Sequence, residues 1–230
     1  MGKKSLFVIG IFLILFSLQS CSSKPEKALL DRYFHAILLN DITTMSTMAL
    51  EPVAIEAKSY EITKVGVDKV EPASLPDLNK KELELKKKLE GHVAPTLDAK
   101  DALDAAKDEL DSARTGAAKN AAKKKVEELQ AKYDQEYELH KQLQKDYNDA
   151  KAAAAREEEI ATFSLGAGEL PTIRELTGNV HSKEVEVKVI SKEGQVKNYI
   201  FHLRMYNLRD ETLNMNRRGR WVIIDFELLS

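Results

Sequence analysis

Cysteine is nearly absent from this chain of 230 residues, because Cys21 is the only one. A single cysteine excludes an internal disulfide. The folded protein must therefore be stabilised by burial of apolar side chains, even in a compartment that permits disulfides. About 210 residues remain beyond the N-terminal apolar region, which is enough for one large domain or two modest ones.

A long hydrophobic run is also missing. The longest run of apolar or small residues extends over 13 positions, from Leu6 to Leu18, whereas a stable transmembrane helix needs about 20. Lys3 and Lys4 precede this run, and Ser20 and Cys21 follow it. A positive start, a short apolar segment and a small residue before the cleavage position are typical of a secretory signal peptide.

The tetrapeptide Leu18-Gln19-Ser20-Cys21 resembles the lipobox of bacterial lipoproteins, although Gln19 stands where a small residue is usual. The resemblance implies cleavage between Ser20 and Cys21 and lipidation of Cys21. Residues 1–20 are then a signal peptide, and residues 21–24 are a lipidated N-terminus and tether. We expect attachment to the membrane through this lipid, in the bacterial cell envelope. Where two membranes are present, Ser22 implies the outer membrane, facing the periplasm.

Excess charge of one sign is absent. Without residues 1–20, which contain Lys3 and Lys4 and no acid, 35 − 2 = 33 basic side chains face 37 acidic ones. A near balance argues against nucleic acid as a partner, because nucleic-acid-binding domains carry a strong basic excess.

The N-terminal tract predicts two helices and a strand. Leu30, Phe34 and Ile37 recur at helical spacing after Pro25, and Asp41 is placed to cap a second, short helix. The stretch 59–67 alternates, but its apolar phase slips beside Gly66. This slip predicts a bulged strand.

The middle tract, residues 77–163, has the Ala, Lys, Glu and Leu-rich composition of long exposed helices. Apolar and small residues recur in heptads on both sides of Gly116, which predicts two antiparallel coiled-coil helices with weak seams. A reversal near Thr115 and Gly116 gives arms of similar length. At about 1.5 Å per residue, the arms extend roughly 55 Å. Gly91 and Pro95 predict a kink or break in the first arm.

The last tract, residues 172–230, alternates like antiparallel strands. Lys192-Glu193-Gly194 suits a three-residue hairpin loop with its glycine in the left-handed region. Pairing Ser191 with Gln195 then sets Val187 opposite Tyr199, with apolar residues facing one another.

Two helices, a strand and a closing meander that ends in Gly-Arg-Trp-Val-Ile (219–223) resemble the nuclear transport factor 2-like cone, also called cystatin-like. The resemblance implies an α+β fold with N-terminal helices packed on a curved antiparallel sheet. We expect a discontinuous cone domain, residues 25–76 plus 164–230, and a coiled-coil hairpin inserted at 77–163.

No catalytic constellation is evident. The five histidines are scattered, and phosphate-binding, zinc-protease and nucleophile-elbow motifs do not occur. We therefore expect no metal site and no cofactor. Asp31 and His35 lie one helical turn apart, which fits either acid-base chemistry or an ordinary exposed pair. Asp225 is a candidate base inside the cone or a salt-bridged edge residue.

Basic side chains gather in two places, at Arg204, Arg209, Arg217, Arg218 and Arg220, and at Lys123-Lys124-Lys125. An anionic partner or an ordinary solvated surface explains both groups.

These observations favour a noncatalytic structural or interaction protein whose hairpin contacts an envelope protein or a second copy. Tyr133, His140 and Tyr147 follow one another at seven-residue steps and are either interaction residues or seam fillers. The alternative is a small-ligand pocket in the cone, lined by Phe34, Tyr60, Phe201 and Trp221. An enzyme is the third hypothesis, since a fold alone gives no activity.

Overall fold

The computed structural model describes residues 24–166, 170 and 172–229. The chain divides into two compact units. Unit 1 comprises the described residues up to Val67, Lys183–Leu203 and the described residues from Trp221 onward, and unit 2 comprises Asp68–Ser182 and Arg204–Arg220. The predicted insertion, residues 77–163, lies wholly within unit 2. The predicted limits of a cone domain stay a prediction.

Unit 1 begins with the two predicted helices, α2 (Pro25–Leu38) and α3 (Ile42–Ser46). Pro25 occupies the first turn of α2, where its missing N–H costs no helical hydrogen bond. The side chain of Asp41 accepts a hydrogen bond from the backbone N–H of Thr44 at 3.0 Å. Asp41 therefore caps α3 as predicted, because it satisfies a donor that the helix leaves unpaired.

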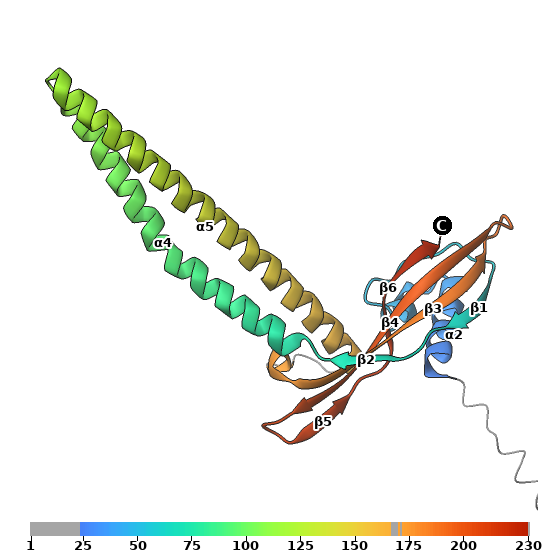
Figure 1. Ribbon diagram of the computed structural model, residues 1–230. Coiled ribbons are helices and arrows are strands. Elements are labelled where there is room, and N and C mark those ends of the chain that lie inside the picture. Colours follow the sequence, from blue (N-terminus) through green and yellow to red (C-terminus); the bar gives the residue numbers. More distant parts are fainter. Residues whose placement is uncertain (1–23, 167–169, 171, 230) are drawn as a thin grey trace, which may run out of the picture. The chain divides into compact units, whose positions relative to one another are not determined.

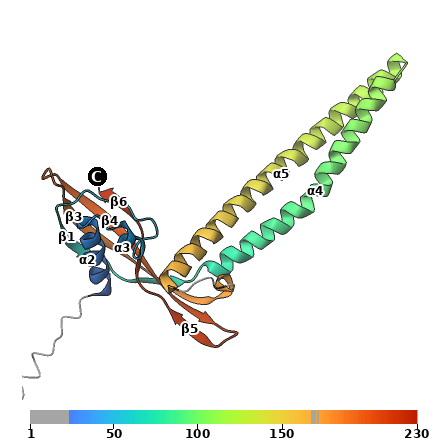
Figure 2. The same cartoon turned by 180° about the vertical axis from the view of Figure 1, so that it is seen from behind.

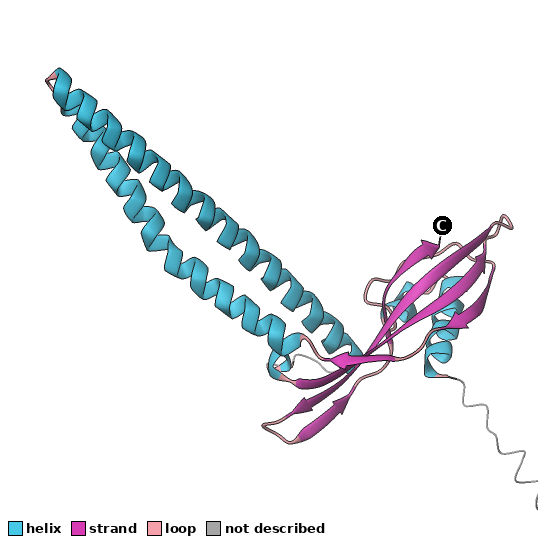
Figure 3. Cartoon of the chain, in the orientation of Figure 1, coloured by secondary structure: helices cyan, strands magenta, loops and turns pink. Residues whose placement is uncertain are grey.

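The sheet is antiparallel in the pairs whose registers are resolved, β1 with β3, β2 with β3 and β4 with β5. Its strands are β1 (Ser59–Val65), β2 (Lys69–Pro72), β3 (Thr177–Ile190), β4 (Val196–Asp210), β5 (Met215–Arg218) and β6 (Val222–Leu229). The order is β1-β3-β4-β5, with β2 also on β3 and β6 on β4. The division between the two units cuts through both long strands, between Ser182 and Lys183 in β3 and between Leu203 and Arg204 in β4. The fold class is α+β, as predicted: N-terminal helices, a curved antiparallel sheet and a long inserted helical hairpin (Figure 3).

The bulge in β1 lies at a different residue from the predicted one. The register against β3 shifts between Ile62 and Lys64, not beside Gly66. Gly66 has another role: its N–H donates to the carbonyl oxygen of Glu184 at 2.8 Å, and a Cβ atom would lie 2.8 Å from that oxygen. Such a close backbone approach requires glycine.

The turn between β3 and β4 confirms the predicted loop. The Ser191 N–H donates to the Gln195 carbonyl at 2.8 Å, and Gly194 has a φ of 83°. Glycine adopts this left-handed conformation without the steric cost of a Cβ atom.

Unit 2 contains the helical hairpin, formed by α4 (Leu75–Ser112) and α5 (Gly116–Leu165), and the short helix η1 (Ile173–Glu175). Figures 1 and 2 show α4 and α5 side by side along their length. The chain reverses where predicted, and the Thr115 hydroxyl caps α5 by accepting from the Ala118 N–H at 3.2 Å. Of the two alternatives predicted for Gly91 to Pro95, a kink or a break, the break is wrong. α4 continues through Pro95, and both figures show a bend in its middle.

The core of unit 1 is aromatic. Phe34 and Phe201 are fully buried, with ring centroids 5.4 Å apart, and Tyr33 contacts both rings edge-on. Phe34 also stacks on Tyr60 at 4.5 Å. Phe34 thus contacts three other rings, and its truncation is costly because these rings cannot all move into the vacated space.

We expect Phe34→Ala to lower the free energy of unfolding by about 3–5 kcal/mol, the usual cost of removing a buried ring. Urea unfolding followed by the fluorescence of Trp221, the only tryptophan, measures this loss. Leu39→Ala is the control, because Leu39 is 66% exposed and should change the stability by about 0.5 kcal/mol or less. Equal losses from both variants would contradict this account of the core.

Candidate interaction surface on the helical hairpin

The seam between α4 and α5 is made largely of small side chains. The buried residues are Leu75, His92, Ala99, Leu103 and Ala106 of α4, and Ala150, Ala154, Ile160, Ala161 and Ser164 of α5. Alanine removes little apolar area from water, so each such layer contributes little to helix association. In α5, moreover, no residue between Gly116 and Asp149 is fully buried. The outer part of the hairpin is therefore held weakly by its own core.

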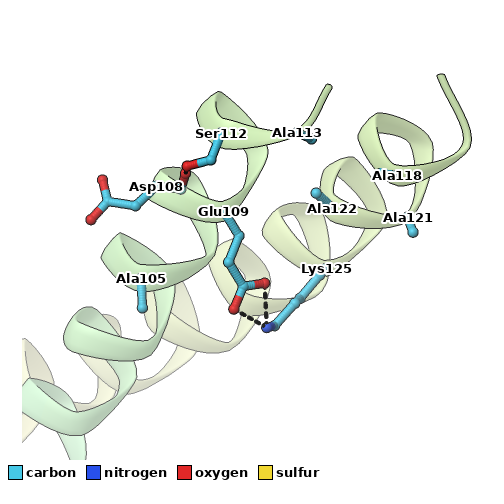
Figure 4. A pocket seen from close by; sticks show the side chains of 9 residues that line it. All are labelled: Ala105, Asp108, Glu109, Ser112, Ala113, Ala118, Ala121, Ala122 and Lys125. Atoms are coloured by element: carbon cyan, nitrogen blue, oxygen red, sulfur yellow. Dashed lines mark hydrogen bonds and ion pairs between the residues drawn. The ribbon is translucent and has the colours of Figure 1, made fainter. Parts of the chain in front are cut away.

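An open groove lies between the two helices near their reversal. It has a volume of about 750 Å³ and is lined by Ala105, Asp108, Glu109, Ser112, Ala113, Ala118, Ala121, Ala122 and Lys125 (Figure 4). The Lys125 ammonium crosses it to the two carboxylate oxygens of Glu109, at 2.9 and 2.7 Å. Both side chains are at least half exposed, and an exposed ion pair contributes about 1 kcal/mol or less. The groove is thus apolar, shallow and only weakly bridged.

The middle of the hairpin carries polar side chains in its seam. His92 is buried, and its Nε2 atom lies 3.4 Å from Oε2 of Glu136. The two atoms are within ion-pair distance, but they are not aligned as a hydrogen bond. His140 contacts His92 edge-on, with ring centroids 6.1 Å apart.

At the other end of the hairpin, Glu157 of α5 organises a partly buried hydrogen-bond network. Its carboxylate accepts from the Tyr206 hydroxyl at 2.7 Å, from Ser74 at 3.0 Å and from Arg204 at 2.8 Å. Burial, followed by the charge of Glu157, raises the pKa of Tyr206 far above its ordinary value. The phenol therefore remains a hydrogen-bond donor at all physiological pH values.

A second ionic contact reinforces this end. Arg174 of η1 donates to Glu82 of α4 at 2.6 Å and to Glu158 of α5 at 2.7 Å. Ser164 adds a further link, because its hydroxyl donates to the Arg220 carbonyl at 2.7 Å and accepts from the Tyr206 N–H at 3.1 Å. Within unit 2, both helices are thus fixed to η1, and α5 is also fixed to β4.

The three residues predicted as interaction residues or seam fillers are all partly exposed. Tyr133 stacks on Tyr137 at 5.8 Å, and the Tyr147 ring lies 6.0 Å from the Lys151 ammonium. His140 alone makes a ring contact with α4. Tyr137, at 44% exposed, is a surface aromatic that the heptad search missed. Its spacing of four residues from Tyr133 is the signal that would have found it.

Further apolar side chains are exposed on the same hairpin. They are Leu83, Val93 and Leu97 of α4 and Leu139 of α5. Val93 and Leu97 lie four residues apart and therefore on one face of α4. Together with the alanine groove, these side chains leave apolar surface in contact with water.

The four residues predicted to line a ligand pocket lie in unit 1. Phe34, Tyr60 and Phe201 belong to the ring cluster described above, in which Phe34 packs against each of the other two. Trp221 is buried beneath the Lys183 ammonium, which lies 4.8 Å from its ring, while Lys183 also donates to the buried Glu26 carboxylate at 3.0 Å. These contacts account for the four side chains as core residues.

The predicted acid-base candidates occupy surface positions. Asp31 and His35 line an open groove of about 500 Å³ beside Tyr60, but the Asp31 carboxylate accepts a hydrogen bond from the Tyr60 hydroxyl at 3.2 Å. Asp225 is exposed and lies 3.8 Å from Nε2 of His202. Of the two positions predicted for Asp225, the structure therefore shows the salt-bridged one, and the side chain does not point into a core.

The clustered basic residues are partly engaged. Arg204 pairs with Glu157, Arg209 with Glu211, and Arg220 lies over the Phe163 ring. Of the three consecutive lysines, Lys125 pairs with Glu109. These contacts explain much of the basic cluster without an anionic ligand.

Cys21 and Ser20 lie outside the described residues. Among the helices that the structure describes, none is both long and apolar enough to cross a membrane. Within the same residues, no group of three or more potential metal ligands converges. No family model, no curated protein and no solved structure matches this chain.

We expect Glu157→Gln to lower the free energy of unfolding by about 1–3 kcal/mol, less than the full cost of breaking a buried ion pair because Arg204 is partly exposed. Urea unfolding followed by helical circular dichroism measures the change. Glu159→Gln is the matched control: it lies two residues away, is 59% exposed and pairs only with Arg156, so it should cost about 0.5 kcal/mol or less. If the two variants are equally stable, the Glu157 network does not fix the hairpin.

Proposed function

We propose that this protein is a lipid-anchored bacterial envelope lipoprotein whose helical hairpin is a noncatalytic docking element for another envelope protein. The observation that carries this proposal is the weak packing of the outer hairpin. α5 has no fully buried residue before Ala150, and an alanine-lined groove opens between the helices near the reversal.

Energetics supports a partner on this surface. The apolar area that two helices remove from water must offset the ordering of their residues. Alanine layers supply little such area, while Val93, Leu97 and Tyr137 remain exposed. A partner helix laid along the outer hairpin would bury these side chains and the groove together, as in a coiled coil with additional strands. A second copy of the chain would satisfy the same requirement.

The contrast between the two ends of the hairpin also supports docking. The end near Glu157 is fixed by short hydrogen bonds to buried partners, whereas the end near Glu109 and Lys125 is bridged by an exposed pair. A binding element gains affinity when it is held rigidly at its base, because less freedom is lost on association.

The proposed location depends on the lipobox resemblance. Several acyl chains on Cys21 would anchor the protein stably, whereas a single chain gives only marginal binding. Ser22 favours the outer membrane, facing the periplasm, where two membranes are present.

The alternative, small-ligand binding in unit 1, has less support. Phe34 is in ring contact with both Tyr60 and Phe201, so a ligand among them would have to displace core contacts. An enzyme remains the third hypothesis, because the acids beside the acid-base candidates have other contacts: Asp41, in the groove with Asp31 and His35, caps α3, and Glu227 lies with Asp225 at the ring of His202.

The docking proposal is tested by photo-crosslinking in cells. A photoreactive phenylalanine analogue at Tyr137 should give a discrete adduct with a distinct envelope protein, identified by mass spectrometry, because this exposed ring lies on the weakly packed part of α5. The same analogue at Leu39, an exposed residue directly after α2, is the control and should not give that adduct. Adducts of the chain with itself alone would replace the partner by a second copy, and absence of any adduct along 93–139 would contradict docking.

The anchoring proposal has its own test. Cys21→Ser should shift the protein from the membrane fraction to the soluble fraction and abolish incorporation of a radiolabelled fatty acid, because the sulfur is the proposed attachment atom. Ser22→Ala keeps the cysteine and should remain in the membrane fraction. Membrane association that survives in Cys21→Ser would exclude the lipid as the anchor.

A further inference from the structure

The seam of the hairpin contains two histidines and a glutamate in one layer. His92 comes from α4, and Glu136 and His140 come from α5, one turn apart. His92 is 8% exposed, and the side chain of Glu136 is 27% exposed. Charged or titratable groups are uncommon in such seams, because burial disfavours an ion that has no partner.

The hydrogen bonds of His92 leave one ring nitrogen facing the carboxylate. The Thr96 hydroxyl donates to the His92 carbonyl at 2.9 Å, so its oxygen, 3.4 Å from Nδ1, is available as an acceptor. A proton on Nδ1 then leaves Nε2 of the neutral ring as an acceptor, 3.4 Å from Oε2 of Glu136. Two acceptors repel each other, whereas a second proton on the ring makes Nε2 a donor to the carboxylate.

His140 has no such carboxylate facing it. Its Nδ1 atom is buried and has no hydrogen-bond partner among the described residues, and its ring centroid lies 6.1 Å from that of His92. Nearby charges are engaged elsewhere: Lys141 pairs with Glu138 at 3.0 Å, and Glu90 lies 3.9 Å from Lys86. Glu136 is thus the one described acid within ion-pair distance of either ring.

We propose that this layer, which we call the His92–Glu136–His140 layer, is a pH-sensitive catch that loosens the outer hairpin, residues 93–139, on mild acidification. The first proton added to the layer pairs His92 with Glu136. The next proton forms an imidazolium on His140 next to that of His92, and a single carboxylate cannot neutralise both. The second cation is hydrated only if the helices separate at this layer.

Two features confine the response to acidification to the outer hairpin. Imidazole is the side chain that ordinarily changes charge between pH 5 and 8. Beyond the layer, the helices are joined by small side chains, the buried Leu103 and an exposed ion pair, so few large buried side chains resist their separation. The catch does not depend on which partner the hairpin binds.

Hydrogen–deuterium exchange of the full chain in detergent tests the catch. After correction for the intrinsic pH dependence of exchange, protection of amides in 93–139 should fall at least about tenfold between pH 7.5 and 5.5. His140→Leu removes the second cation and should reduce this fall to less than about twofold. His35→Leu is the matched control: His35 is exposed on α2 and should leave the tenfold fall unchanged.

Glu136→Gln provides a second test that does not rely on His140→Leu folding normally. Without its carboxylate, the layer cannot neutralise even the first imidazolium, so the fall in protection should exceed that of the unmodified chain. Equal protection at the two pH values in the unmodified chain would overturn the proposal. A full tenfold loss in a folded His140→Leu variant, or an unchanged fall in Glu136→Gln, would do so as well.

Discussion

The arrangement of unit 2 depends on the carboxylate of Glu157. This one side chain receives hydrogen bonds from Ser74, immediately before α4, and from Tyr206 and Arg204 on β4. It therefore joins the start of one hairpin helix, the end of the other and a strand of the sheet. The Glu157 side chain is only 12% exposed. Loss of its charge would therefore leave Arg204 without its ionic partner at a partly buried site, and such a loss costs more than the net contribution of the pair.

Beyond this network, stabilisation declines along the hairpin. Leu75 and Ile160 are large buried residues near the Glu157 end, whereas alanines dominate the lining of the groove near the reversal. The His92–Glu136–His140 layer lies between them. Polar layers of this kind weaken a seam, but they fix the alignment of helices, since a slip by one turn would bury the same groups without their partners. The hairpin thus combines one rigid end with a loosely packed one.

Features that depend on neighbouring residues can be predicted from the sequence, whereas contacts between distant residues cannot. The Asp41 cap and the Gly194 turn follow from rules that act within a few residues, and the reversal at Thr115 follows from the requirement for arms of similar length. β1 is bulged as predicted, but the register shift lies between Ile62 and Lys64 and not beside Gly66. For Pro95 the sequence left a kink or a break open, and α4 continues through this residue. The Glu157 network joins residues 49 positions apart, and no periodic pattern marks such a pair.

The first residue of α2 has a consequence for where encounters take place. Pro25 begins this helix, only 25 − 21 = 4 positions after the proposed lipid-bearing cysteine. Four residues extend at most roughly 14 Å. Unit 1 would then be attached through a very short linker. It would diffuse with the membrane and would not diffuse freely through the surrounding compartment. Its search for a partner becomes two-dimensional, which favours partners that are themselves confined within reach of the same surface.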